Sequence, residues 1–183
     1  MIHRIKYVVL TIVFSLVWMV NANATVVAFD PSAVTVNKLD EFTINIVGID
    51  FAELAGGDSI GFEFDGSIIE VIGVTVDSHF DFDPISGSRS SINKWEGIAF
   101  DIFVNDPATA DFTIATVTLK ALETGISTLT LLDTANYFST TALLSPTIGT
   151  AQITVNAVPL PSAIFLLGSG VIGLISCFRK KSD

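Results

Sequence analysis

Residues 112–121 read FTIATVTLKA, and this stretch decides the fold class. Apolar and polar side chains alternate along it, and most are β-branched or aromatic, which favours a strand with one buried face. Five further stretches have the same character. They are residues 42–46, 60–64, 68–76, 127–132 and 151–155. The centre of the chain is therefore predicted to consist of short strands.

Turn-forming residues separate these stretches. They are Gly56-Gly57-Asp58, Asp65-Gly66, Asp83-Pro84, Asn105-Asp106-Pro107 and Thr124-Gly125. A short helix is expected near residues 51–54, and residues 77–93 are expected to form an extended loop. Many short strands with regular turns predict an all-β fold, an antiparallel β-sandwich.

The charge of the chain is unevenly distributed along its 183 residues. Residues 25–158 hold four bases and 18 acids, a formal charge of −14, whereas the whole chain carries −10. Such an acidic centre argues against nucleic-acid binding, which needs a basic surface to meet phosphates. The single cysteine excludes an intrachain disulfide framework and a cysteine-based zinc finger.

The N-terminus is typical of a secretory signal peptide, predicted over residues 1–24. Three basic residues precede the apolar run of residues 7–20, and small residues follow it in an A-x-A pattern at Ala22 and Ala24. Signal peptidase is expected to cut after Ala24. The alternative is an uncleaved N-terminal anchor, although the run is short for a membrane span.

The C-terminus has three successive parts over residues 157–183. Two prolines first interrupt the chain, and a transmembrane helix is predicted next over residues 162–178, about 25 Å long. A basic cluster then closes the chain and is expected in the cytoplasm. The first part is Val158-Pro159-Leu160-Pro161-Ser162-Ala163, and the cluster is Arg179-Lys180-Lys181.

These three parts resemble the PEP-CTERM sorting signal in its VPLPSA variant. The resemblance implies processing by an exosortase, a membrane protease-transpeptidase of Gram-negative bacteria that make exopolysaccharide. The protein is then expected at the inner membrane, facing the periplasm, and after processing at the cell surface or in the extracellular matrix. Prolines 159 and 161 lack backbone donors and hold the chain extended, as a protease cleft requires. The alternative is a plain single-pass anchor.

The body of the chain, residues 25–156, resembles a cohesin domain. Three segments carry the resemblance, namely residues 34–42 (VTVNKLDEF), 60–71 (IGFEFDGSIIEV) and 114–129 (IATVTLKALETGISTL). The resemblance implies a nine-stranded jelly-roll sandwich related to carbohydrate-binding modules, and a dockerin-like partner. Phe64 and Gly66 stand where the family usually has Tyr and Pro, and residues 77–103 match poorly.

Few residues in the chain offer catalytic or metal-binding chemistry. His79 is the only histidine beyond the signal peptide, and no G-x-S-x-G elbow accompanies it. Residues 168–173 match G-x-G-x-x-G, but they lie in the predicted membrane helix and follow no strand. Asp77, Asp81 and Asp83 could hold calcium, yet their spacing is not that of an EF-hand, and a solvated acidic loop is favoured. No cofactor is expected.

Aromatic side chains could bind sugars if they are exposed. Phe80, Phe82 and Trp95 would then form a stacking platform, although phenylalanine more often fills a core. The favoured function is a non-catalytic binding or adhesion module of the cell surface or the extracellular polysaccharide matrix. The alternatives are a cohesin-type scaffold that binds a dockerin-bearing partner and a small carbohydrate-active enzyme.

Overall fold

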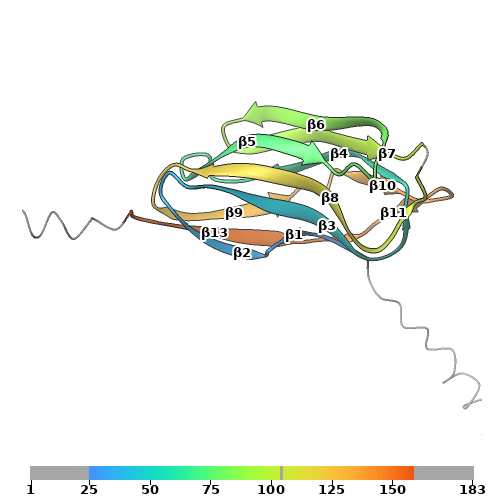
Figure 1. Ribbon diagram of the computed structural model, residues 1–183, viewed down its shortest axis with the longest axis horizontal. Helices are drawn as coiled ribbons and strands as arrows, with labels where there is room; N and C mark the ends of the chain where they lie inside the picture. Colours follow the sequence, from blue (N-terminus) through green and yellow to red (C-terminus); the bar gives the residue numbers. More distant parts are fainter. Residues whose placement is uncertain (1–24, 104, 159–183) are drawn as a thin grey trace, which may run out of the picture.

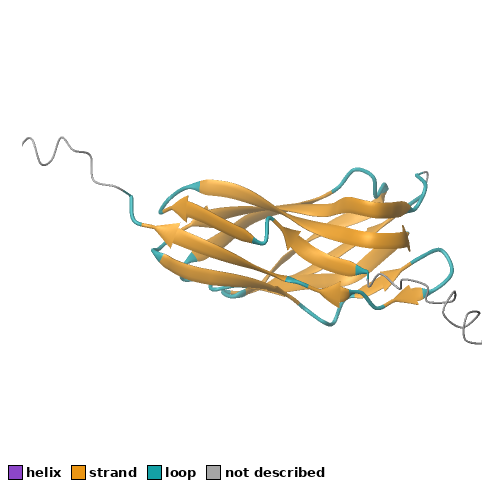
Figure 2. Ribbon diagram, turned by 90° about the horizontal axis from the view of Figure 1, so that it is seen from below, coloured by secondary structure: helices purple, strands orange, loops and turns teal. Residues whose placement is uncertain are grey.

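The computed structural model describes residues 25–103 and 105–158, which form two β-sheets packed face to face (Figures 1 and 2). The predicted signal peptide with Ala22 and Ala24 lies outside the described residues. So do the predicted membrane helix and residues 159–163 and 179–181 of the sorting signal. Within the described residues there is no helix, and hence none that could cross a membrane. The predicted all-β sandwich is confirmed.

The first sheet has five strands. In spatial order they are β12 (Thr147–Ile148), β1 (Val26–Asp30), β3 (Glu41–Leu54), β8 (Ala108–Ala121) and β5 (Ile69–Val76). Residues 112–121 lie in β8, between β3 and β5.

The second sheet has eight strands. Six follow one another as β11 (Leu143–Leu144), β10 (Asn136–Phe138), β4 (Gly56–Glu63), β9 (Gly125–Leu131), β13 (Thr150–Asn156) and β2 (Ala33–Asn37). On the other side of β4 lies β7 (Lys94–Asp101), and β6 (Phe82–Ser91) pairs with β7. All pairs are antiparallel except β1 with β12 and β2 with β13, which are parallel.

The core lies between the two sheets and is formed by the inward-facing residues of each strand. Ile44, Ile114 and Leu119 from the first sheet, and Ile60 and Leu129 from the second, are completely buried. Every buried residue of this core falls between positions 27 and 155. Residues 25–158 therefore contain a complete core and are expected to fold independently of the two ends of the chain.

All six predicted strands are present, but four local predictions are wrong. Residues 51–54 continue β3 instead of forming a helix. Register shifts on both sides of Phe51 break the alternation and create an apolar spacing of three residues. The predicted turn at residues 56–58 is instead the start of β4. A Cβ at Gly56 would lie 2.6 Å from the ring of Phe138, so this strand position has no room for a side chain.

The third wrong prediction is the extended loop over residues 77–93, because residues 82–91 form β6. This strand lies at the edge of its sheet and is exposed almost throughout, so its sequence has no apolar alternation. Asp83-Pro84, expected as a turn, lies within β6 at a register shift, and Asp83 has a positive φ of 42°.

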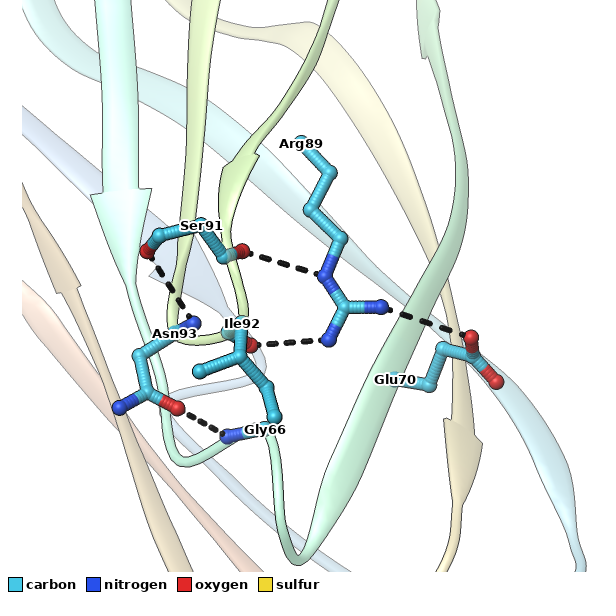
Figure 3. A network of polar contacts seen from close by, with 6 residues as sticks. All are labelled: Gly66, Glu70, Arg89, Ser91, Ile92 and Asn93. Atoms are coloured by element: carbon cyan, nitrogen blue, oxygen red, sulfur yellow. Dashed lines mark hydrogen bonds and ion pairs between the residues drawn. The ribbon is translucent and has the colours of Figure 1, made fainter.

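The hairpin of β6 and β7 is fixed near its turn by Arg89 (Figure 3). The guanidinium donates from Nε to the carbonyl oxygen of Ser91 at 3.1 Å and from Nη2 to that of Ile92 at 3.0 Å. Its Nη1 also lies 3.6 Å from the Glu70 carboxylate on β5. Arg89 therefore connects the edge of the second sheet to the edge of the first.

The described chain enters and leaves near opposite ends of the long axis (Figure 1). The last strand ends at Asn156, whose carbonyl oxygen accepts a hydrogen bond from the amide of Lys38. We call this the C-terminal end. The other end, which we call the tip, contains the start of β4, the end of β7 and strand β10, where Gly56 and Gly57 pair with Phe138 and Phe100.

Candidate binding surface

Two exposed phenylalanines lie at the tip. Phe82, at the start of β6, is 49% exposed, and Phe103, just after β7, is 77% exposed. Their rings are stacked, with centroids 5.7 Å apart and planes inclined by 28°. Two exposed phenylalanines in contact are unusual, because burial of each would contribute about 1.5–3 kcal/mol.

A shallow cleft of about 210 Å³ lies beside Phe82. Phe138 also lines the cleft, and Leu143, which is 77% exposed, pairs with Phe138 across β10 and β11. The cleft is further lined by Gly57, Asp58, Asp83, Ala99, Phe100 and Asp101. We name Phe82, Phe103, Phe138 and Leu143 the tip patch.

Hydrogen bonds between two loops hold the stacked rings in place. The Asp81 carboxylate accepts the backbone N–H of Phe103 at 2.7 Å, and the Asn105 amide donates to the carbonyl oxygen of His79 at 2.7 Å. These bonds connect the segment before β6 to the segment after β7. Each segment brings one of the two exposed phenylalanines.

The three candidate calcium ligands do not form a common site. Asp77 accepts the backbone N–H of His79 at 2.9 Å, and Asp81 binds the Phe103 amide. Among residues 25–103 and 105–158, no three histidine, cysteine, aspartate or glutamate side chains are grouped so that they could hold a metal ion. Asp77 and Asp81 instead act as acceptors that shape the loops, and Asp83 lines the cleft.

The predicted aromatic platform is only partly present. Phe80 is 1% exposed and packs in the core, with its ring centroid 4.4 Å from that of Phe100. Trp95 is half-buried, and its Nε1 donates to the carbonyl oxygen of Ser86 at 2.9 Å. Only Phe82 is exposed as expected, and its partner is Phe103, which sequence reasoning did not place beside it. The contact depends on the pairing of β6 with β7, so neither composition nor periodicity could have shown it.

His79 is held by the same loops, and among the described residues its ring makes no hydrogen bond to a serine, cysteine or threonine side chain. Its Nε2 lies 2.8 Å from the carbonyl oxygen of Asp106, so this nitrogen carries the proton and donates it. The ring also stands edge-on against Phe80, with centroids 5.5 Å apart. This geometry assigns His79 to loop structure.

Glu53 fixes a further loop near the tip. Its carboxylate accepts the backbone N–H of Thr140 at 2.7 Å. Hydrogen bonds from the Thr140 side chain and backbone hold the pKa of Glu53 below its usual value. The loop that connects β10 to β11 is thereby tied to the end of β3.

A larger groove, of about 520 Å³, lies on the first sheet between β1, β3 and β8. Phe112 forms one side of it, and Asp30 and Asp111 supply carboxylates. Asp111 accepts the backbone N–H of Asp50 at 3.0 Å. Its two aromatic residues are not exposed, since Phe29 belongs to the core and Phe112 packs against it.

Comparisons with solved structures identify the fold. The sixth cohesin of Acetivibrio cellulolyticus scaffoldin B, solved in complex with a Cel5 dockerin variant, superposes with a TM-score of 0.62 at 11% identity, over 73% of this chain and 100% of the cohesin. The cohesin CaCohA2 of Clostridium acetobutylicum gives 0.60 at 18% identity, over 73% and 92%. A non-cellulosomal cohesin of the archaeon Archaeoglobus fulgidus gives 0.58 at 12%, over 73% and 92%.

The chain has the cohesin fold. No protein-family model and no curated protein matches the sequence, so the likeness rests on structure alone. The cohesin-like sandwich expected from the sequence is therefore confirmed at the level of the fold. The match spans nearly the whole of each cohesin, so the likeness covers both sheets of the fold.

Proposed function

We propose that residues 25–158 form a non-catalytic cohesin-type module that binds a dockerin-like protein partner. The observation that carries this proposal is the full-length match to cohesins, one of which was solved with a dockerin bound. A rigid sandwich suits such a role because it presents fixed surfaces at little cost in conformational entropy. The exposed tip patch adds an apolar surface of the kind that protein interfaces use.

We further propose that the protein is exported and sorted by an exosortase. The support is the order of parts at the two ends of the sequence, an A-x-A after an apolar run and a VPLPSA segment before a basic tail. Val158, the first residue of that segment, is exposed at the C-terminal end of the sandwich. Attachment through the C-terminus would leave the tip as the outermost part of the domain.

A binding experiment tests the first proposal. Purified residues 25–158 are titrated by calorimetry with each dockerin domain encoded in the same genome, identified by its duplicated calcium-loop motif. The expected result is saturable one-to-one binding to at least one dockerin. Absence of binding to all of them, with retention on the host's exopolysaccharide instead, would favour the matrix-adhesion role. Release of sugar from that polysaccharide would refute the non-catalytic function.

A truncation tests the sorting proposal in the native host. Removal of residues 159–183 is expected to release the protein into the periplasm or the medium, as seen by fractionation. Loss of an exosortase is expected to leave a heavier protein in the membrane. A truncated protein that stays membrane-bound after signal removal would contradict sorting, and an unchanged mass without the exosortase would favour a permanent anchor.

A further inference from the structure

The tip patch differs from other exposed apolar positions in that its members adjoin one another. Phe103 stacks on Phe82, Phe82 shares the cleft with Phe138, and Phe138 pairs with Leu143. Ile72 on β5 and Ile126 on β9 are also exposed, but they lie on separate strands and line no cleft with this patch. The ring stacking, the shared cleft and the strand pairing thus place these four residues next to one another at the tip.

Carboxylates surround the tip patch. Asp58, Asp83 and Asp101 all line the cleft with Phe82. Within the described part of the chain, the carboxylates of Asp58 and Asp83 make no hydrogen bond or ion pair. Asp101 accepts only the backbone N–H of the next residue, at 2.8 Å. No basic side chain among residues 25–103 and 105–158 forms an ion pair with these carboxylates.

The basic residues lie away from the tip. Each of the four in residues 25–158 is within 4 Å of a glutamate, in the pairs Lys38–Glu123, Arg89–Glu70, Lys94–Glu96 and Lys120–Glu41. Lys38 and Lys120 lie at strand ends near the C-terminal exit, and Lys94 and Arg89 lie near the turn of the β6–β7 hairpin. The tip is consequently the end where acidic charge is least compensated.

We propose that the tip patch docks a partner polypeptide segment in which arginine or lysine stands beside apolar side chains. The faces of Phe82 and Phe103 attract a cation, and the nearby carboxylates add Coulomb attraction. The apolar neighbours of that cation would cover Phe138 and Leu143. This inference rests on the proposed function, because it names the chemistry of the protein partner.

The negative charge of the domain also disfavours two other occupants of the tip patch. A second copy of this domain would bring −14 against −14, so self-association through the tip is opposed by repulsion. An acidic polysaccharide is opposed for the same reason. A neutral glycan remains as an outcome that the experiment must separate.

The experiment uses nuclear magnetic resonance on residues 25–158, which contain the whole core. The probe is the peptide acetyl-Leu-Arg-Ser-Arg-Leu-amide, and the matched control has citrulline, which is nearly isosteric with arginine but uncharged, at both arginine positions. The expected result is that the arginine peptide shifts the amide signals of Gly57, Asp83 and Phe103. We expect about fivefold weaker binding of the citrulline peptide.

Two variants test whether the arginine peptide binds at the tip patch. The double variant Phe82→Ala/Phe103→Ala is expected to bind the arginine peptide about tenfold more weakly, and Asp58→Asn/Asp83→Asn about fivefold more weakly. The matched control Ile72→Ala/Ile126→Ala removes two equally exposed apolar side chains elsewhere and is expected to bind as the parent does. All substituted side chains are exposed, so the fold is expected to persist.

Several results would overturn the inference. They are equal binding of the citrulline peptide, no binding of either peptide, shifts confined to another surface, or shifts of the same amides by cellohexaose alone. A dockerin that binds the parent and Phe82→Ala/Phe103→Ala equally would refute the tip inference while supporting the cohesin-type function. If the arginine peptide binds at the tip but no dockerin binds the domain, the tip inference would be supported and the cohesin-type function refuted.

Discussion

The hydroxyl of Ser127 accepts a hydrogen bond from the backbone N–H of Asp65 at 2.9 Å. Ser127 lies on β9 and is completely buried. Asp65 begins the turn between β4 and β5, where the chain passes from the second sheet to the first. A single buried hydroxyl thus anchors a crossing between the two layers.

Ser127→Ala is expected to destabilise the domain by about 1–2 kcal/mol, because the amide of Asp65 then loses its acceptor. The free energy of unfolding, measured by urea denaturation of residues 25–158, checks this value. The control is Thr128→Ser at the exposed neighbouring position, which should change the stability by less than about 0.5 kcal/mol. Equal effects of the two substitutions would show that the buried hydrogen bond contributes nothing.

Alanine substitutions at two glycines on neighbouring elements should change the free energy of unfolding in opposite directions. A Cβ at Gly66 would overlap the backbone carbonyl of Ile92, which cannot move without breaking its bond to Arg89. Gly66→Ala is therefore expected to cost about 2–3 kcal/mol. At Gly73 on β5 a Cβ would meet no atom within 4 Å, so Gly73→Ala should be neutral or stabilising by up to about 1 kcal/mol.

The measurement is again the unfolding midpoint in urea, with the slope of the transition compared between variants. A destabilised Gly73→Ala would mean that this strand has a crowding partner outside the described contacts. A stable Gly66→Ala would mean that the turn and the Ile92 carbonyl can separate freely.

The strands could be predicted because each buries one face, and the alternation this requires is visible in single stretches such as residues 112–121. Where the two-residue period is broken, prediction failed. In β3 the register shifts around Phe51 imitate a helical spacing, and β6 carries no period because both its faces are exposed. Gly56 and Gly57 were predicted to form a turn. They lie in β4, where their lack of side chains leaves room for the rings of Phe138 and Phe100.

The tip patch illustrates what single-sequence reasoning cannot supply. The sequence allowed both Phe80 and Phe82 to be either exposed or buried. Phe82 is exposed, whereas Phe80, two residues earlier, is buried. The two residues differ in their tertiary neighbours, because Phe80 packs on Phe100 in the core and Phe82 stacks on the exposed Phe103. These contacts join separate segments of the chain, and the local sequence does not show them.

Removal of the Arg89 side chain should loosen the β6–β7 hairpin without unfolding the sandwich. Arg89→Ala loses two hydrogen bonds to carbonyl oxygens and the contact with Glu70, an expected cost of about 1 kcal/mol for a side chain this exposed. Amide hydrogen exchange should accelerate in β6 and the start of β7 and remain unchanged in β3 and β8.

Arg89→Lys separates charge from geometry. A lysine keeps the attraction to Glu70 but has no planar fork to reach the carbonyl oxygens of Ser91 and Ile92 together. The lysine variant should therefore exchange almost as fast as the alanine variant. Protection restored to the parental level by lysine would show that the ion pair alone fixes the hairpin.

Tyr137 on β10 is buried, and its hydroxyl has no hydrogen-bond partner among the described residues. Burial raises its pKa above the usual value, because the charged phenolate is poorly solvated there. Tyr137→Phe is accordingly expected to be neutral or stabilising, by up to about 1 kcal/mol at pH 7. A clear loss of stability would mean that the hydroxyl has a partner outside the described residues.

The raised pKa of Tyr137 should make the stability of the domain fall at alkaline pH. Above pH 10 the unfolded chain loses the tyrosine proton while the native state retains it, so the unfolded state binds fewer protons and stability falls as the pH rises. The chain has two tyrosines, and Tyr7 is absent from residues 25–158, so phenolate absorbance of that domain reports Tyr137 alone. The absorbance should rise only together with unfolding, and Tyr137→Phe should abolish that part of the pH dependence. A titration near pH 10 in the folded protein would show that the ring is accessible to solvent.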